Sequence, residues 1–317
     1  MRAAIIDNRS LVIREAPDPV PGTGEILVRV KAAGLNNADR MQIMGSYPAP
    51  PGSPADIPGM ELAGEVVGTG PGVFRFAPGD AVMGVVGGGA LAELLVVNER
   101  TMMAMPPQLS WVEAGGFPEA FTTAHDALVT QCGLLSGERL CVHGAAGGVG
   151  IAAVQIGACM GADVIATVRS PELRVPVEGL GRGIIAVDPG EFTGHGPFDV
   201  IIELVGAANL GPNLAALRIG GRISVIGVSG TGGRAELDLL TLMTKRARIH
   251  GSTLRARPME QKADAARRVE AQVIPHVAAG RITVPIVEVF PLERAVEAYA
   301  RFAAGTKFGK IVISLDS

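Results

Sequence analysis

A cluster of small residues near the middle of the chain has the types and spacing needed to bind the phosphates of a dinucleotide. The stretch 139–170 reads as a short apolar strand, a glycine-rich turn, a helical repeat and a second strand. Within it, Ala145, Gly147 and Gly150 form an A-x-G-x-x-G variant of the dinucleotide fingerprint. Small side chains let the backbone approach a pyrophosphate closely, and the following helix directs its free N–H groups toward that anion. The stretch therefore predicts a dinucleotide site.

Two other interpretations of this stretch are possible. No Asp, Glu, Lys or Arg lies between Arg139 and Asp163, so a membrane-spanning helix is one alternative. A glycine turn that serves only packing is the other. The glycines bunched at 144, 147, 148 and 150 argue against a membrane span, and the strands on both sides favour a nucleotide site over mere packing.

The residues after the second strand bear on which cofactor binds. An NAD site usually has Asp or Glu about 20 residues past the fingerprint, where it accepts hydrogen bonds from the ribose 2′-OH. Here Arg169 and Ser170 occupy that place, and Arg174 follows one helical turn later. A guanidinium attracts a 2′-phosphate through charge-assisted hydrogen bonds, whereas a carboxylate would repel it. NADPH is therefore predicted over NADH; the alternative is two arginines on a solvated loop.

The composition of the whole chain is that of an α/β protein. The chain has 317 residues, a net charge of −3, 48% hydrophobic residues and only 4% aromatic ones. The slightly acidic balance and the few aromatic side chains disfavour nucleic acid or an anionic membrane as partner. Three cysteines form no metal-binding cluster and, being odd in number, argue against a disulfide framework. No signal peptide is evident at the start, so a cytoplasmic location is expected.

The elements that must position these residues fall into a β-rich part and an alternating part. About the first 115 residues alternate apolar runs with Gly and Pro turns, which predicts a barrel-like domain. From Val112 helical spacing takes over, and strands then alternate with helices, 188–198 being a loop. A charged helix over about 259–280 and later elements are expected to return to the first domain. The predicted strands of the alternating part are 140–143, 164–168, 184–187, 199–203, 222–227 and 248–253; the closing elements are a strand at 286–290, a helix at 292–304 and a strand at 310–315.

Six strings spread along the chain carry a family resemblance: GLNNAD (34–39), PGMELAGEVVGTGPGV (58–73), PGDAVMG (78–84), HGAAGGVG (143–150), GGRISVIG (220–227) and GKIVI (309–313). Together they resemble the medium-chain dehydrogenase/reductase superfamily over essentially the whole chain. Within it, the chain is similar to zinc-free, NADPH-dependent quinone oxidoreductases, and 36–52 and 118–124 most resemble the branch induced by a tumour suppressor. The resemblance implies an α/β fold: a GroES-like β-barrel catalytic domain (1–116 and 259–317) with an inserted Rossmann NADPH-binding domain (117–258). It also implies a homodimer paired through an edge strand near 248–254.

The resemblance also bears on metal. Zinc-dependent members have a Cys in the place of Asn36, a His in the place of Met60 and a third ligand near Glu119. An amide and a thioether replace two of these ligands, and catalytic zinc needs three good donors. The four-cysteine structural lobe is also missing, because 80–110 contains no cysteine. No metal is therefore expected.

By the same resemblance, Asn36 and Tyr47 are the expected catalytic residues, and both line the nicotinamide pocket. The alternative for Asn36 is a hydrogen bond within its own turn, and for Tyr47 a surface role in a Gly/Pro-rich loop. Pro189 and the short loop 188–198 depart from the family pattern at the 2′-phosphate end. The full set of expected cofactor contacts is Asn36, Tyr47, Thr123, Ala146, Gly147, Gly148, Val149, Arg169, Ser170, Arg174, Gly206, Gly227, Val228, Thr253, Leu254 and Lys310.

Together these features predict a zinc-independent oxidoreductase that transfers a hydride from NADPH to a small quinone or a similar activated carbonyl or alkene. Two alternatives stay open. One is an enoyl-thioester reductase, in which Tyr47 would protonate the substrate. The other is a cofactor-binding protein with little catalysis.

Overall fold

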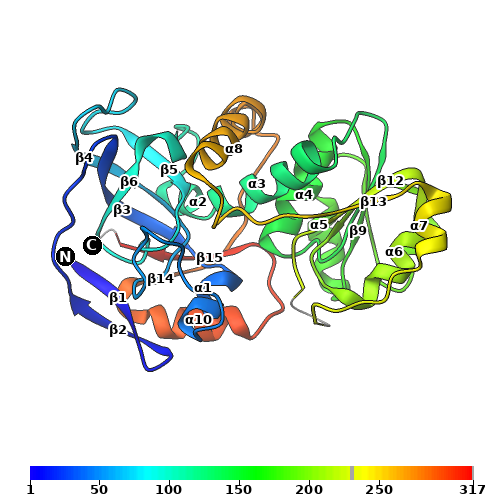
Figure 1. Cartoon of the computed structure of the whole chain (residues 1–317), viewed down its shortest axis with the longest axis horizontal. Helices are drawn as coiled ribbons and strands as arrows, with labels where there is room; N and C mark the ends of the chain where they lie inside the picture. Colours follow the sequence, from blue (N-terminus) through cyan, green and yellow to red (C-terminus); the bar gives the residue numbers. More distant parts are fainter. Residues whose placement is uncertain (229–231, 316–317) are drawn as a thin grey trace. The chain divides into compact units, whose positions relative to one another are not determined.

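The computed structural model describes residues 1–228 and 232–315, which form two compact units (Figure 1). Unit 1 consists of Met1–Glu119, Leu254–Ala278 and Val284–Ser317. Unit 2 consists of Ala120–Thr253 and Ala279–Thr283, so the short segment 279–283 groups with unit 2 rather than with the segments around it. The chain therefore leaves unit 1 after its β-rich part and returns to it after the nucleotide fingerprint.

Unit 1 is built on a seven-stranded sheet and a separate hairpin. The sheet has the order β14-β15-β3-β4-β5-β7, with β6 paired to β3, and β1 pairs with β2. All of these pairs are antiparallel except β14 with β15. The strands are β1 (Arg2–Asp7), β2 (Ser10–Glu15), β3 (Glu25–Gly34), β4 (Glu61–Thr69), β5 (Ala81–Val85), β6 (Leu94–Asn98), β7 (Met102–Ala104), β14 (Ile286–Pro291) and β15 (Lys310–Ser314).

The core of unit 1 lies between this sheet and the closing helix. Ile26, Val28 and Val30 alternate along β3 and are buried, as a strand with one face on a core requires. Ala298 and Tyr299 of α10 pack into the same cluster. The helices with residues in unit 1 are α1 (Asn37–Ile43), α2 (Trp111–Gly115), α3 (Pro118–His125), which runs on into unit 2, α8 (Met259–Gln272), α9 (Ile274–Ala278) and α10 (Ala295–Ala303), with 3-10 turns at Glu99–Thr101 and Leu292–Arg294.

The single helix predicted over about 259–280 is interrupted in the structure. α8 ends at Gln272, and α9 begins at Ile274. Pro275 has no N–H and its ring crowds the preceding turn, so a continuous helix cannot pass through this position. The interruption was visible in the sequence, and the prediction was wrong here.

Unit 2 contains a six-stranded, fully parallel sheet in the order β10-β9-β8-β11-β12-β13. The order reverses between β8 and β11, which places a topological switch point at the carboxyl end of β8. The strands are β8 (Arg139–Val142), β9 (Asp163–Thr167), β10 (Ile184–Val187), β11 (Phe198–Glu203), β12 (Leu217–Val225) and β13 (Arg248–Gly251). The helices are α4 (Gly148–Cys159), α5 (Arg174–Glu178), α6 (Leu210–Ala216) and α7 (Leu239–Lys245), with a π-helical turn at Asp126–Gln131 and 3-10 turns at Pro171–Leu173, Phe192–His195 and Ala207–Asn209.

The segment predicted as a loop over 188–198 contains the 3-10 turn Phe192–His195. Phe192 is the reason: its ring lies edge-on to His143 and stacked on Phe198, so it is buried in the unit 2 core. Burying an aromatic ring stabilises a compact turn that Gly and Pro content alone does not predict.

The membrane-spanning alternative for the fingerprint helix is excluded by its length. α4 has 12 residues, whereas a span needs about 20. Across the described part of the chain, no helix combines the length and the apolar character that crossing a bilayer requires.

Candidate nicotinamide cofactor site

The glycine-rich turn leads directly into the amino end of α4. Gly147 is the N-cap residue, and no side chain caps the first turn, which also contains no acidic residue. The first N–H groups of a helix have no partner within the helix, and the helix dipole makes this end positive. The end of α4 can therefore accept the pyrophosphate of a dinucleotide.

The glycines of this turn are needed for two different reasons. A Cβ on Gly150 would lie 2.4 Å from the Gly144 carbonyl oxygen, so only glycine permits the close packing of helix against turn. A Cβ on Gly147 would meet no atom nearer than the Gly144 oxygen, at 3.5 Å. A side chain at 147 would thus fill open space in front of the helix end. The turn fits the phosphate group that the sequence predicts.

Later turns of unit 2 show the same need for glycine at predicted positions. Gly206 has φ = 138°, in the range that L side chains rarely adopt. A Cβ on Gly227 would lie 2.8 Å from the Leu204 carbonyl oxygen. Both residues follow the carboxyl ends of strands, β11 and β12, where ligands of such sheets bind.

The two arginines predicted at the 2′-phosphate end differ in their surroundings. Arg169 lies two residues past β9 and is exposed, and among the described residues it has no ion-pair or hydrogen-bond partner. Arg174 instead donates to Asp188 Oδ2 at 2.8 Å and to the Val168 carbonyl at 3.2 Å. The charge of Arg174 is therefore partly balanced within the protein, and Arg169 is the residue with an uncommitted guanidinium.

Glu203 organises the turn that follows β11, and sequence reasoning did not identify it. This buried carboxylate accepts hydrogen bonds from the N–H groups of Val205 (2.6 Å) and Gly206 (2.8 Å) and from the Asn213 amide (2.8 Å). Asn213 in turn contacts His143 at 2.7 Å, and burial lowers the pKa of that histidine. The only sequence signal was an acidic residue at the end of an apolar strand.

In unit 1, Lys310 lies at the centre of a buried polar cluster. Its ammonium donates to Glu61 Oε1 at 2.6 Å, Asn36 Oδ1 at 2.9 Å and the Leu35 carbonyl at 3.0 Å. Asn36 Nδ2 donates to the same Glu61 oxygen at 2.9 Å and to the Gly34 carbonyl at 3.3 Å. Both ends of the Asn36 amide and all three ammonium protons therefore have partners inside unit 1.

A second carboxyl group, Asp39, is buried beside this cluster on α1. Its Oδ2 accepts the Asn36 N–H at 2.8 Å, which caps the helix. Burial raises the pKa of Asp39 to about 7, although the Asn36 N–H, Lys310 and Arg255 act in the opposite direction. Tyr299 is a neighbour whose pKa is raised well above its usual value by burial and by the charge of Asp39.

Tyr47 lies beyond the other end of α1 and is half-buried. Its ring centroid is 5.2 Å from the guanidinium carbon of Arg255, and its carbonyl accepts a hydrogen bond from that group at 3.3 Å. Arg255 itself was not predicted from the sequence.

Comparison with known proteins identifies the family to which this geometry belongs. Residues 22–107 match the alcohol dehydrogenase GroES-like domain, and residues 148–271 match the zinc-binding dehydrogenase family. A quinone oxidoreductase from Lama guanicoe is 30% identical over 308 residues, which are 94% of this chain and 91% of that protein. The chain belongs to the medium-chain dehydrogenase/reductase superfamily.

The chain is also similar to a polyketide synthase protein and to a solved alcohol dehydrogenase. The spectinabilin polyketide synthase system protein NorB from Streptomyces orinoci is 39% identical over 220 residues, which are 67% of this chain. This match spans only 10% of that protein's length. The crystal structure of an NAD-dependent alcohol dehydrogenase has a TM-score of 0.87 and 29% identity over 99% of this chain and 100% of that one.

Membership confirms the predicted fold class, a GroES-like domain with a Rossmann-type parallel sheet. It also makes this chain an oxidoreductase of a superfamily that binds a nicotinamide dinucleotide. The expected contacts divide between the units. Asn36, Tyr47, Leu254 and Lys310 belong to unit 1, and Thr123, Ala146, Gly147, Gly148, Val149, Arg169, Ser170, Arg174, Gly206, Gly227, Val228 and Thr253 belong to unit 2.

The positions that hold zinc in some superfamily members have other chemistry here. Within residues 1–228 and 232–315, no three His, Cys, Asp or Glu side chains are grouped so as to hold a metal ion. Of the three positions compared above, Asn36 accepts a hydrogen bond from the Lys310 ammonium, which also bonds the neighbouring carboxylate of Glu61. A metal cation binding at these oxygens would face the charge of that ammonium.

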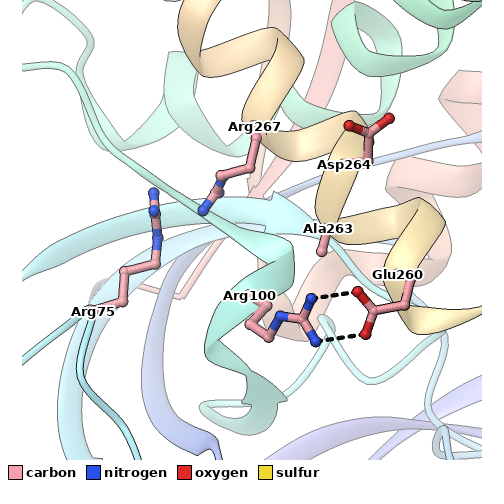
Figure 2. A pocket seen from close by; sticks show the side chains of 6 residues that line it. All are labelled: Arg75, Arg100, Glu260, Ala263, Asp264 and Arg267. Carbon is pink, nitrogen blue, oxygen red and sulfur yellow. Dashed lines mark hydrogen bonds and ion pairs between the residues drawn. The ribbon is translucent and has the colours of Figure 1, made fainter.

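Unit 1 also contains a hollow of about 370 Å³ away from the predicted site residues (Figure 2). Among its lining residues, Arg100 and Glu260 are joined directly by two hydrogen bonds, of 2.7 and 2.5 Å. Arg75 bonds Glu270 at 2.6 Å, and Arg267 bonds the Met102 carbonyl. Each of these guanidiniums has a partner within the protein, so they connect α8 to the sheet rather than offering a free anion site.

Proposed function

We propose that this protein is a zinc-independent NADPH:quinone oxidoreductase acting on a small-molecule quinone. The observation that carries the proposal is that the Lys310 ammonium donates hydrogen bonds to the side-chain oxygens of Asn36 and Glu61. A fixed cation already serves these oxygens, which favours a substrate whose reduction needs no Lewis acid. A quinone is such a substrate, because its reduced oxygens are stabilised phenolates that need neither a metal nor a strong acid. The 30% identity to a quinone oxidoreductase over nearly the full length supports the same substrate class.

When bound, NADPH supplies the hydride, and the quinone accepts this electron pair. The residues of the chain hold the cofactor in place and stabilise the charge that develops on the acceptor. The amino end of α4 holds the pyrophosphate, and the Tyr47 hydroxyl donates a hydrogen bond to the acceptor oxygen as negative charge develops on it. Asn36, whose amide is held at both ends, forms a fixed polar wall of the pocket. One proton, taken from water, then completes the hydroquinone.

The preference for NADPH rests on Arg169. This guanidinium follows β9, at the place where NAD-binding relatives carry an acid that bonds the ribose 2′-OH. It is exposed and uncommitted among the described residues, so it can bind a 2′-phosphate without first breaking a bond. Arg174 could bind only by sharing its charge with Asp188.

We also propose that the protein forms a homodimer through β13. This strand is at the end of the unit 2 sheet, where its outer backbone groups can pair with another strand. The helix just before it, α7, exposes Leu239, Leu240 and Met243, each by at least 65%. A second copy would cover these apolar side chains while the two β13 strands pair.

The proposal is tested by measuring NADPH oxidation with 1,4-benzoquinone, a naphthoquinone and 9,10-phenanthrenequinone. Turnover clearly above the rate without protein is expected for at least one of them. Failure with every quinone would refute the substrate class, and tight NADPH binding in the same preparation would then identify a cofactor-binding protein with little catalysis.

A second candidate is the reduction of an enoyl thioester. The 39% identity to a polyketide synthase protein over 220 residues supports it, because polyketide assembly works on thioesters. Tyr47 would then deliver a proton to the enolate carbon. Comparing kcat/KM for crotonyl-CoA and for the best quinone decides between them, and a higher value for the thioester would favour this second candidate.

A further inference from the structure

We propose that Arg255 is a positioning residue that fixes the ring of Tyr47 and thereby sets which acceptors are reduced. The inference rests on the role of Tyr47 in the proposed function. Arg255 itself does not contact the reacting atoms; it acts through Tyr47.

The guanidinium of Arg255 joins three segments of unit 1. It donates to the Gly87 carbonyl at 2.8 Å, to the Tyr47 carbonyl at 3.3 Å and to the Gln42 side-chain oxygen. Arg255 is only 2% exposed. The charges of Asp39 and Glu119 act on its guanidinium electrostatically. Burying a guanidinium is costly, which distinguishes Arg255 from an exposed arginine that links two surface segments.

One side of this junction is tightly packed. A Cβ on Gly87 would lie 2.0 Å from Ser53 Oγ, and one on Gly88 would lie 3.0 Å from the Pro54 carbonyl oxygen. The two loops are therefore in close contact, and the Gly87 carbonyl has a fixed place. Arg255 is bound to this fixed point through its Nε.

The other side, which carries Tyr47, is open. Gly45 and Gly52 flank Tyr47 with positive φ values of 76° and 82°, and a Cβ on either would meet nothing within 4 Å. Backbone bonds from the Ser46 and Tyr47 N–H groups to the Met41 carbonyl hold the start of this loop. They do not orient the aromatic ring.

The orientation of the ring comes instead from the guanidinium near it. A cation within about 6 Å of a ring centroid is attracted to its face, most strongly where water is excluded. At 5.2 Å, Arg255 meets this condition while its fork also holds the Tyr47 carbonyl. The ring and the backbone of Tyr47 are thus both held by one rigid, planar guanidinium. Lysine cannot reproduce this arrangement, because its ammonium is a single point charge without several donors in fixed directions.

The composition of the chain offers a direct probe of this arrangement. It contains only two tyrosines, Tyr47 and Tyr299, so ring-¹³C-labelled tyrosine gives two sets of NMR signals. Tyr299 is buried in the core and reports whether the fold is intact. Arg255→Lys is the test variant, and Arg268→Lys, on the exposed face of α8, is the matched control.

We expect Arg255→Lys to shift the Tyr47 signals and to leave those of Tyr299 in place. The affinity for NADPH should stay within about twofold, whereas kcat/KM for the best quinone should fall about tenfold or more. The ratio of kcat/KM between 1,4-benzoquinone and 9,10-phenanthrenequinone should change, because the ring no longer has one orientation. Arg268→Lys should match the wild type in all of these.

Unchanged Tyr47 signals in a folded Arg255→Lys protein would overturn the proposal. So would a loss of kcat/KM that is equally large in a Tyr47→Ala background, because Arg255 would then act independently of Tyr47. If Arg255→Lys loses the Tyr299 signals, Gln42→Leu, which removes one anchor of the guanidinium, replaces it; a Tyr47 shift supports the proposal and no shift refutes it. Shifted Tyr47 signals in a protein that reduces no quinone would refute the proposed function and leave the positioning contact standing.

Discussion

The ammonium nitrogen of Lys310 lies 2.6 Å from Oε1 of Glu61, and neither side chain is more than 7% exposed. The pair sits on β15 and β4, next to the Asn36 amide that it orients. A cofactor contact by Lys310, as implied by the family resemblance, would require it to give up one of three existing hydrogen bonds. Its observed role is to neutralise a buried carboxylate and to hold the amino end of α1.

Replacing Lys310 should therefore destabilise the protein strongly. In Lys310→Met, Glu61 is left as an uncompensated buried charge, which typically costs about 3–5 kcal/mol. The double variant Lys310→Met/Glu61→Gln should recover part of this loss, because the charge itself is gone. Chemical denaturation measures both. A loss below about 1 kcal/mol in the single variant would show that the pair contributes little.

Arg169 should control the choice between the two nicotinamide cofactors. In Arg169→Ala, the dissociation constant for NADPH should rise about tenfold or more, because a charge-assisted contact is lost, while that for NADH changes little. Arg182→Ala, an exposed arginine of the same unit, is the control. Calorimetric titration with both cofactors measures the effect; equal losses for NADPH and NADH would show that Arg169 does not meet the phosphate.

Tyr47→Phe separates stabilisation of developing charge from packing. The ring and its contact with Arg255 remain, so only the hydroxyl is lost. Turnover should fall roughly tenfold or more, with the dissociation constant for NADPH nearly unchanged. Steady-state kinetics with a quinone, together with a binding titration, tests this; unaltered turnover would assign Tyr47 to packing alone.

The buried carboxyl of Asp39 should make stability depend on pH. Its folded-state pKa of about 7 lies above the usual value of 3.8, so between these values the folded protein keeps a proton that the unfolded chain has released. The free energy of unfolding should therefore decrease as the pH rises from about 4 to 7. Asp39→Asn should remove this contribution. The free energy of unfolding of the variant minus that of the wild type should therefore be more favourable at pH 8 than at pH 5. Urea titrations at both pH values measure it, with Asp163→Asn as the exposed control; a difference between wild type and variant that does not vary with pH would contradict the assignment.

The proposed dimer should depend on the apolar face of α7. In the double variant Leu240→Asp/Met243→Asp, the two new carboxylates would be buried in the dimer but exposed in the monomer. The double variant should therefore sediment as a monomer. The wild type is expected to sediment as a dimer at the same concentration. A monomeric wild type would reject the dimer, and a dimeric double variant would exclude α7 from its interface.

The sequence predicted the strands of unit 2 and the glycine turn before α4, because each depends on residues close together in the chain. The cofactor role of Arg169 comes from the same kind of local pattern and stays a prediction. Their chemistry can be interpreted without knowing the fold, because turn, helix and strand follow one another directly.

The contacts that were missed join distant residues. Arg255 meets Gln42 across 213 positions, and Lys310 meets Asn36 across 274. Nothing in the sequence near Arg255 distinguishes it from Arg257, since only the folded chain brings the α1 loop to it. That both ends of the Asn36 amide have hydrogen-bond partners could not be predicted, for the same reason. The residue type alone, an amide where zinc-dependent relatives have a cysteine, indicated only that zinc is not expected.

We expect this chain to reduce a quinone with NADPH and without a bound metal. The most direct test is the rate of NADPH oxidation with the best quinone after exhaustive dialysis against a chelator, compared with the same protein after zinc is added back. Quinone-dependent turnover should remain intact after dialysis and should not increase when zinc is added. Turnover abolished by the chelator and restored by stoichiometric zinc would contradict it.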